Sequence, residues 1–313
     1  MDQSFTLRKA RFNNRVFVAS GTFGYGNEVP DLVDIDKLGG IMTKSLSWKP
    51  REGNPPPRIA ETAAGMLNSI GLANIGVHKF IEEKLPALER HACGIIANIA
   101  ASSVEEYCQV LELLEPYKRV DGFEINVSCP NVKEGGLSFG TDVGKVALIT
   151  RELRKRTAKP LILKLTPNVT HISEFARAAE AEGADAISVI NTLIGMSVNI
   201  HTKKPKISSV TGGLSGPAIK PIALAKVFES YKAVKIPIFG IGGISSWEDA
   251  IEFFLVGASA VQVGTANFLN AGVAVGIAEG IVRYCDTHAV KDFSELIGGI
   301  KADSSASVIQ SWL

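Results

Sequence analysis

The stretch IPIFGIGGISSWEDAIEFFLVGASAVQVGT, residues 236–265, holds two short apolar segments with an amphipathic helix pattern between them. Ser246 and Asp249 have the spacing of a capping box that starts this helix, and Gly257 marks its end. Each apolar segment is followed by a glycine-containing turn. This pattern predicts two parallel strands, buried on both faces and connected by a helix.

The same strand–helix unit recurs along the whole chain. One helix is predicted to start at a capping box formed by Ser103 and Glu106, another to be capped by Thr141, and the helix after His171 to end at Gly183. The expected strands are Val16–Ala19, Gly40–Thr43, Ile95–Ile99, Gly122–Asn126, Leu161–Leu165, Ala186–Ile190, Ile236–Gly240 and Ala260–Val263.

Eight such units in 313 residues favour an α/β fold with one closed (β/α)8 TIM barrel, a single domain over residues 1–313. The alternative is an open doubly wound sheet, but Gly21-Thr-Phe-Gly24 lacks the Gly-x-Gly-x-x-Gly spacing that would support it. Three connections are too long for simple loops: Lys44–Cys93, Ser128–Gly140 and Thr192–Gly216. We expect them to extend the face at the strand C-termini, where barrels carry active sites.

The composition excludes several classes of function. Lysine and arginine number 33 against 32 aspartates and glutamates, a net charge of +1, so a nucleic-acid-binding surface is not expected. The apolar stretches are too short to span a membrane, and the first twelve residues do not resemble a signal peptide. The four cysteines are scattered without metal-ligand spacing, so no metal site is predicted and a cytoplasmic location is expected.

Glycine-rich turns follow the last two predicted strands, at Gly240–Gly243 and at Gly264-Thr265. Glycine lets backbone N–H groups approach an anion closely, and barrels commonly bind phosphate after strands seven and eight. The alternative is that these glycines only make tight turns. Their occurrence at both positions favours phosphate binding.

Two lysines belong to predicted strands or their ends, Lys44 after the second strand and Lys164 within the fifth. Burying an unpaired ammonium is unfavourable, so each lysine needs an anion, such as a reduced flavin or a substrate carboxylate. A lysine whose head group reaches solvent or pairs with a carboxylate of the protein remains the alternative.

Amide side chains gather at the predicted strand ends and in the loops beyond them. An amide offers both donors and an acceptor, which suits a flat heterocycle with alternating N–H and C=O groups, although any single asparagine could serve a turn instead. The asparagines are Asn68, Asn98, Asn126, Asn131 and Asn191, with Thr192 beside the last.

Cys129 directly follows the fourth predicted strand, in the long connection that contains Gly135 and Gly136. A thiol there is a candidate base once its thiolate is stabilised, although its position alone leaves an inert buried thiol equally open. Cys93, Cys108 and Cys285 belong to helix or helix-edge patterns and are predicted to be small apolar residues.

Five motifs together resemble the soluble, class 1 dihydroorotate dehydrogenases, from about Phe17 to about Ala302. They are Asn68-Ser-Ile-Gly-Leu-Ala-Asn74, Asn126-Val-Ser-Cys-Pro-Asn-Val132, Leu163-Lys-Leu-Thr-Pro-Asn168, Val189-Ile-Asn-Thr192 and Gly212-Gly-Leu-Ser-Gly-Pro217. The stretch 191–196, residues 212–224 and the Gly298-Gly-Ile-Lys-Ala302 tail are most similar to the class 1B catalytic subunit.

The resemblance implies an FMN-binding barrel that oxidises (S)-dihydroorotate to orotate in pyrimidine (UMP) biosynthesis. It implies that Cys129 takes the C5 proton while the C6 hydride passes to the flavin. The implied substrate contacts are Lys44, Asn68, Asn126, Asn131, Asn191 and Thr192. The implied FMN contacts are Ala19, Ser20, Gly21, Lys44, Ser45, Asn98, Asn126, Lys164, Ile190, Gly216, Gly242, Gly243, Gly264 and Thr265.

The electron acceptor is implied only by the subclass. Class 1B subunits form a homodimer within a heterotetramer, and a partner with FAD and an iron–sulfur cluster passes electrons to NAD⁺. Class 1A relatives use fumarate without a partner. Three rival functions remain: a flavin dihydropyrimidine dehydrogenase subunit, a flavin-free lyase or aldolase that uses Lys164 as a Schiff base, and a non-catalytic docking subunit.

Overall fold

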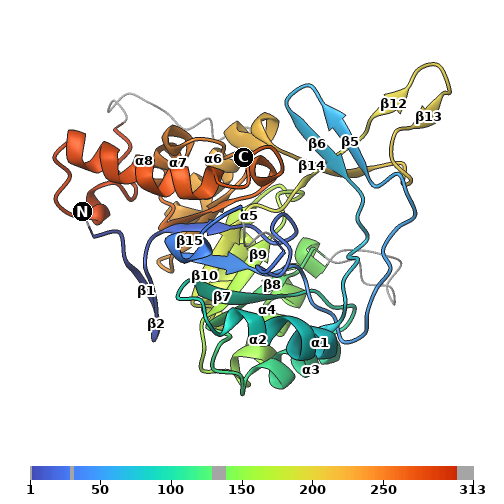
Figure 1. Cartoon of the computed structure of the whole chain (residues 1–313), viewed down its shortest axis with the longest axis horizontal. Helices are drawn as coiled ribbons and strands as arrows, with labels where there is room; N and C mark the ends of the chain where they lie inside the picture. The colour runs from blue at the N-terminus through green and yellow to red at the C-terminus, as the bar shows by residue number, and fades with distance from the viewer. Residues whose placement is uncertain (1, 29–31, 129–138, 302–313) are drawn as a thin grey trace.

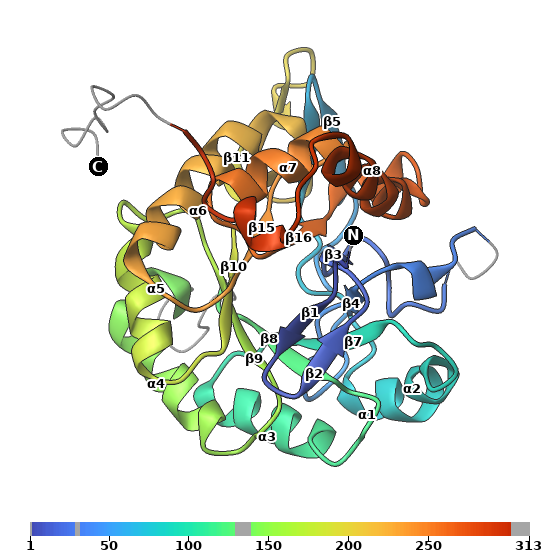
Figure 2. The same ribbon diagram turned by 90° about the vertical axis from the view of Figure 1, so that its left-hand side faces the viewer.

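Eight parallel strands close into a barrel, in the order β10-β15-β16-β3-β4-β7-β8-β9. The computed structural model describes residues 2–28, 32–128 and 139–301. Barrel strands that follow one another along the chain pair with each other. The last of them, β16, closes the ring by pairing with the first, β3 (Figure 2). The barrel strands are β3 (Val16–Val18), β4 (Gly40–Met42), β7 (Gly94–Ile99), β8 (Gly122–Asn126), β9 (Leu161–Leu165), β10 (Ala186–Val189), β15 (Ile238–Ile241) and β16 (Ala260–Val263). The predicted TIM barrel is confirmed.

The predicted strand bounds are confirmed for β8, β9 and β16 and differ by one residue for β3, β4, β7 and β10. The prediction for β15 was wrong at both ends, because the strand runs over Ile238–Ile241 and not Ile236–Gly240. Pro237 has no N–H for the ladder and contributes only its carbonyl, which accepts from the N–H of Ile187.

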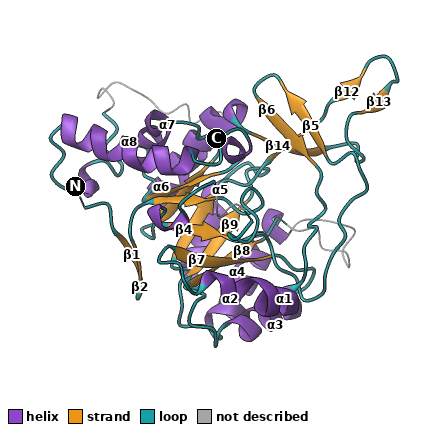
Figure 3. Ribbon diagram, viewed as in Figure 1, coloured by secondary structure: helices purple, strands orange, loops and turns teal. Residues whose placement is uncertain are grey.

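Helices surround the barrel, as the views along and across its axis show (Figures 2 and 3). Each presents its apolar face to the outward-pointing residues of the strands. They are α1 (Val77–Lys79) and α2 (Leu85–Leu88), joined by the π-helical turn Phe80–Lys84, then α3 (Val104–Leu114), α4 (Val143–Arg154), α5 (Ile172–Ala181), α6 (Lys220–Ala233), α7 (Trp247–Leu255) and α8 (Val273–Thr287). Over the described part of the chain, none of these helices combines the length and apolar character needed to cross a membrane.

The predicted helix ends are confirmed in part. The capping box of α7 forms as expected between Ser246 and Asp249. The cap of α4 was wrong: Asp142, not Thr141, is the N-cap, and its carboxylate accepts from the N–H of Lys145. Ser103 caps α3 by accepting from the N–H of Glu106, but the carboxylate of Glu106 does not return the bond, because it binds other groups described below.

A hairpin of β1 (Phe5–Leu7) and β2 (Ala10–Phe12) covers the N-terminal end of the barrel (Figures 1 and 2). Phe5 and Phe12 of the hairpin meet inward-facing Phe17 and Phe239. Ring centroids lie 5.7 Å apart for Phe5 and Phe239, and 5.2 Å apart both for Phe12 and Phe17 and for Phe17 and Phe239. This apolar layer, completed by Met42, Ile96 and Ile162, fills the lower half of the barrel.

The longest connections form a second sheet beyond the opposite end of the barrel, where the strands end at their C-termini. It has the order β11-β14-β6-β5 and projects from the barrel in Figure 1. Its strands are β5 (Ile59–Thr62), β6 (Gly65–Asn68), β11 (Leu193–Gly195) and β14 (Gly212–Ser215), and the small hairpin of β12 (Val198–Asn199) and β13 (Lys204–Pro205) extends it. The sequence predicted these connections to be long but did not predict their strands.

Replacing Phe239 by alanine is expected to lower the free energy of unfolding by about 3–5 kcal/mol, because the side chain is fully buried between Phe5 and Phe17. Chemical denaturation of the purified protein measures the change. Phe268→Ala is the control, since Phe268 is 53% exposed and its removal should change the free energy little. Equal effects of the two substitutions would contradict the packing described for the apolar layer.

Candidate active site

Polar side chains occupy the barrel interior directly above the apolar layer. We call this set, formed by Asn98, Glu124, Lys164, Ser188 and Gln262, the polar layer. All five residues belong to barrel strands, and the carboxylate of Glu124 lies among the other four. Inward and outward positions alternate along each strand, so Glu124 points inward while its neighbours Phe123 and Ile125 pack against the helices.

The carboxylate of Glu124 accepts three hydrogen bonds. Nδ2 of Asn98 lies 2.6 Å from Oε2, whereas Oγ of Ser188 and Nε2 of Gln262 each lie 2.7 Å from Oε1. Nζ of Lys164 lies 3.7 Å from Oε2, so the lysine predicted to need an anion has a carboxylate of the protein beside it. This is the ion-pair alternative that the sequence left open for Lys164.

Glu124, Ser188 and Gln262 were missed by the sequence analysis. The signal was present for Glu124, because a carboxylate within an apolar strand needs a partner for the same reason as Lys164 does. Ser188 and Gln262 gave no such signal, since a single neutral polar residue in a strand is common.

Lys44 differs from Lys164 in its surroundings. It is half-buried just beyond β4, and no carboxylate of the described residues lies within ion-pair distance of its ammonium group. Burial lowers the pKa of Lys44; Arg58 adds to this effect and Glu28 opposes it. A partly dehydrated cation without a carboxylate partner among the described residues suits an anionic ligand.

Three of the predicted amide residues, Asn68, Asn126 and Asn191, lie at the C-terminal end of the barrel. Nδ2 of Asn191 donates to Oδ1 of Asn126 at 3.2 Å, and Oδ1 of Asn191 accepts from the N–H of Thr192 at 2.9 Å. Nδ2 of Asn68 donates to the carbonyl of Gly213 at 3.2 Å, and a Cβ on Gly213 would lie 2.3 Å from Oγ1 of Thr192. The second sheet therefore brings Asn68 beside Thr192.

Three glycine-containing turns meet at the same end. A Cβ on Gly243, whose φ is +75°, would lie 2.8 Å from the carbonyl oxygen of Gly216, so only glycine fits there. Oγ1 of Thr265 lies 2.8 Å from Oγ of Ser215, which precedes Gly216. The predicted turns after β15 and β16 thus lie next to the turn after β14. Glycine in such turns leaves backbone N–H groups open to an anion, so we call the three turns the glycine cradle, a candidate phosphate site.

The segment after β3 lies along this cradle. A Cβ on Gly264 would be 3.6 Å from Cβ of Ala19, and a Cβ on Gly21 would meet nothing within 4 Å. The remaining predicted FMN contacts lie on several elements. Ser20 follows Ala19, the hydroxyl of Ser45 donates to Oδ1 of Asn98 at 2.6 Å, and buried Ile190 follows β10. The adjoining glycine turns, the space beside Gly21 and the partly buried ammonium groups of Lys44 and Lys164 suit the phosphate and ring of FMN.

Cys129 and Asn131, which the sequence predicts to be the base and a substrate contact, lie outside the described residues. The other three cysteines are buried free thiols, as expected for small apolar residues. Burial raises the pKa of Cys93 to about 12 and also raises the pKa of Cys108 and of Cys285. None of these three thiols reaches the C-terminal end of the barrel as a candidate base.

Comparison with known proteins decides between the barrel enzymes that share such a cradle. A family model described as "Dihydroorotate dehydrogenase" matches residues 4–284. The chain belongs to the dihydroorotate dehydrogenase family. It is therefore an enzyme, a dihydroorotate dehydrogenase, and the relatives below indicate the B type.

Several relatives carry the name "Dihydroorotate dehydrogenase B (NAD(+)), catalytic subunit", and two of them are compared with this chain. The protein of Geotalea uraniireducens is 50% identical over 299 residues, which cover 96% of this chain and 98% of the relative. That of Bacteroides fragilis is 46% identical over 300 residues and covers 96% and 99%. The crystal structure of DHODH in complex with ferulenol from Eimeria tenella matches with a TM-score of 0.77 over 95% of this chain and 88% of that chain; at 22% identity it supports the fold alone.

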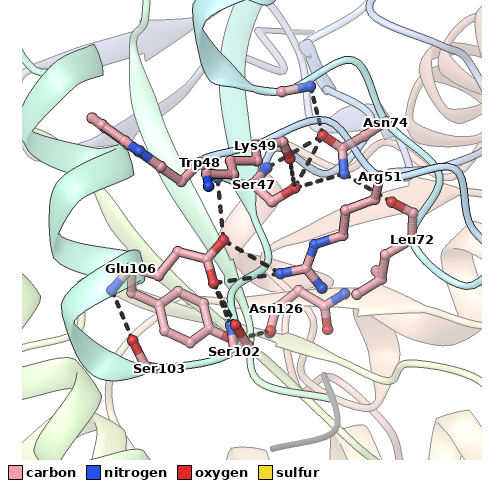
Figure 4. A network of polar contacts seen from close by, with 12 residues as sticks. Ser47, Trp48, Lys49, Arg51, Leu72, Asn74, Ser102, Ser103, Glu106 and Asn126 are labelled. Carbon is pink, nitrogen blue, oxygen red and sulfur yellow. Dashed lines mark hydrogen bonds and ion pairs between the residues drawn. The ribbon is translucent and has the colours of Figure 1, made fainter. Parts of the chain in front are cut away.

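In this dehydrogenase, the carboxylate of Glu106 on α3 binds the start of the long connection 44–93 through a hydrogen bond and an ion pair (Figure 4). Its Oε2 accepts from both the N–H and the hydroxyl of Ser102 at 2.7 Å, and its Oε1 accepts from the N–H of Trp48 at 3.2 Å. Nη2 of Arg51 lies 3.3 Å from the same Oε1. The next residue, Tyr107, donates its hydroxyl to the carbonyl of Asn126 at 2.6 Å.

Asn74 holds the other end of the Asn68–Asn74 motif against the same segment. The backbones of Arg51 and Asn74 exchange two hydrogen bonds, and Nδ2 of Asn74 donates to Oγ of Ser47 at 2.8 Å. The contacts of Glu106 and Asn74 therefore fix the connection that carries both Lys44 and Asn68.

Glu106→Gln is expected to lower the free energy of unfolding by about 1–3 kcal/mol at pH 7, because the carboxylate accepts hydrogen bonds that an amide cannot all reproduce. Burial raises the pKa of Glu106, but its bonds with Ser102 and the charge of Arg51 outweigh that effect and lower it. A lowered folded-state pKa stabilises the protein above the ordinary value near 4.5, and this contribution disappears as the pH falls through the folded-state pKa.

Denaturation of the wild type and of Glu106→Gln from pH 7 down to pH 3 measures this difference, which should shrink on acidification. Glu248→Gln is the matched control, because Glu248 also lies in the first turn of a helix but is exposed. A difference that stays constant with pH would contradict the role given to the Glu106 carboxylate.

Proposed function

We propose that this chain is the FMN-binding catalytic subunit of a B-type dihydroorotate dehydrogenase, which oxidises (S)-dihydroorotate to orotate in pyrimidine biosynthesis. In this proposal residues 1–313 form a single barrel domain located in the cytoplasm. The observation that carries it is the grouping, at one barrel end, of the cation of Lys44, the joined amides of Asn126 and Asn191, and the glycine cradle.

FMN would be held along the segment Ala19–Gly21, with its phosphate in the cradle of Gly216, Gly242, Gly243, Gly264 and Thr265. Lys164, Asn98, Ser45 and Asn126 would face its ring or its ribityl chain, and Ile190 would pack against it. When bound, FMN supplies the acceptor for the hydride that leaves C6 of the substrate.

The residues of the chain orient the substrate and take its proton. Lys44 suits the orotate carboxylate, because its ammonium lacks a carboxylate partner among the described residues. Asn68, Asn126, Asn191 and Thr192, with Asn131, offer the donors and acceptors that the ring N–H and C=O groups require. Cys129 is proposed to take the proton from C5, so that the C–H electrons remain as the new C5=C6 double bond.

The relatives' names support the choice of acceptor, since they specify a catalytic subunit and NAD(+). We propose a homodimer of this chain within a heterotetramer, with FAD and an iron–sulfur cluster in the partner subunit. The fumarate-dependent A type is the alternative. A second, iron-containing subunit that co-purifies with this chain supports the B type, whereas fumarate reduction by the isolated chain supports the A type.

Anaerobic mixing with dihydroorotate should bleach the flavin absorbance of the purified protein, whereas dihydrouracil, which lacks the carboxylate, should not. Bleaching by dihydrouracil instead would favour the dihydropyrimidine dehydrogenase alternative. A purified protein without flavin absorbance would favour a lyase or aldolase that uses Lys164, or a docking subunit.

Cys129→Ala is expected to abolish this bleaching near pH 7 while FMN remains bound, because no other group would accept the C5 proton. Cys129→Ser should react slowly and recover only at high pH, since a hydroxyl is a weaker acid than a thiol. Cys108→Ala is the matched control and should bleach at the wild-type rate. Near-normal bleaching by Cys129→Ala would contradict the role of Cys129.

Gly264→Ala is expected to weaken FMN binding by about tenfold or more. The protein itself accommodates the added methyl group, whose nearest atom would be 3.6 Å away, but a phosphate close to the backbone would not. Fluorescence titration of the FMN-free protein with FMN measures the affinity. The control is Gly276→Ala, since a Cβ on Gly276 meets nothing within 4 Å. Equal affinities of the two variants for FMN would contradict the proposed contact between Gly264 and the FMN phosphate.

A further inference from the structure

Glu124 is a fully buried carboxylate, with 0% of its surface exposed, at the centre of the barrel. Its hydrogen bonds come from Asn98 on β7, Ser188 on β10 and Gln262 on β16, so that one side chain connects four of the eight strands. A buried ion is expensive to desolvate, and apolar side chains of similar volume usually stabilise a core better. Stability alone therefore does not explain a glutamate at this position.

The charge of Glu124 has a single counter-charge among the described residues, the ammonium of Lys164 at 3.7 Å. Lys164 is itself only 5% exposed. The two groups together are neutral, and both lie where water screens them little, so removing either one would leave an uncompensated charge inside the barrel.

The carboxylate also decides which way two amides face. Nδ2 of Asn98 must point to Glu124, so Oδ1 of Asn98 faces the hydroxyl of Ser45 at 2.6 Å. In the same way Nε2 of Gln262 points to Glu124, which leaves the buried Oε1 of Gln262 without a hydrogen-bond partner in the described structure. Turning this amide over would place its oxygen against the carboxylate, which is less favourable still.

We propose that Glu124 is a positioning residue for the flavin: it holds the ammonium of Lys164 and the amide of Asn98 in place, and its charge sets the relative affinity of the site for oxidised and reduced FMN. This inference rests on the proposed FMN site. Reduced flavin carries additional negative charge, which Lys164 attracts and Glu124 repels. The pair therefore stabilises the reduced form less than Lys164 alone would.

Glu124→Gln should favour reduced over oxidised FMN, by about tenfold in relative affinity, because the charge of Lys164 is then uncompensated. A tenfold change corresponds to about 30 mV for a two-electron couple, so equilibration of the FMN-loaded protein with a redox dye measures it as a higher potential. Lys164→Met should shift the potential in the opposite direction, because the charge of Glu124 then acts alone. The double variant should return towards the wild type.

Ser188→Ala is the matched control. It removes one hydrogen bond to Glu124 but keeps both charges, so it should lower the free energy of unfolding without shifting the potential. A shift in Ser188→Ala as large as in Glu124→Gln would mean that the network acts through packing and would overturn the proposal.

An unchanged potential in Glu124→Gln would also overturn it. If Glu124→Gln does not fold, the double variant is compared with Lys164→Met, and a double variant whose potential is not higher than that of Lys164→Met is the overturning result. These outcomes are distinct from a failure of the proposed function, in which the wild-type protein would bind no FMN.

Discussion

The carboxylate of Glu124 lies 3.7 Å from the ammonium of Lys164 inside a closed barrel, where neither group can be stabilised by bulk water. The orientation of the other polar side chains in the barrel interior depends on this pair. Asn98, Ser188 and Gln262 turn their donors towards the carboxylate, and Ser45 is drawn in through Asn98. Below the pair lie the apolar side chains of Phe5, Phe12, Phe17 and Phe239, so the described barrel interior is divided into an apolar lower half and a polar upper half.

The upper half becomes a site because segments far apart in the sequence are brought together above it. Asn68 reaches the barrel only because β6 pairs with β14, and Gly216 reaches the cradle only because it follows β14. Glu106 and Asn74 then hold the connection between β4 and β7 in position. Family membership rests on the sequences of relatives, whereas the arrangement of the candidate site rests on geometry.

Apolar strands such as Leu161–Leu165 could be predicted to the residue, because a buried run flanked by Pro160 and by the Thr166-Pro167 pair has clear ends. The residues that these strands contact in the folded protein could not be predicted. The pairing of Glu124 with Lys164 depends on the stagger between β8 and β9, which no single strand specifies. Glu106 has the spacing of a capping box, yet Ser102, Trp48 and Arg51 compete for its carboxylate, and two of those three belong to another connection. The second sheet joins residues about 145 positions apart, beyond the reach of local pattern.

The hairpin of β1 and β2 determines how substrate and product enter and leave the enzyme. Because Phe5 and Phe12 seal one end of the barrel, the molecule is a cup and not a tunnel. A molecule that enters along the axis has to leave by the way it came. The product must therefore leave before the next substrate can enter. The residues at the rim of the open end contact every molecule that passes.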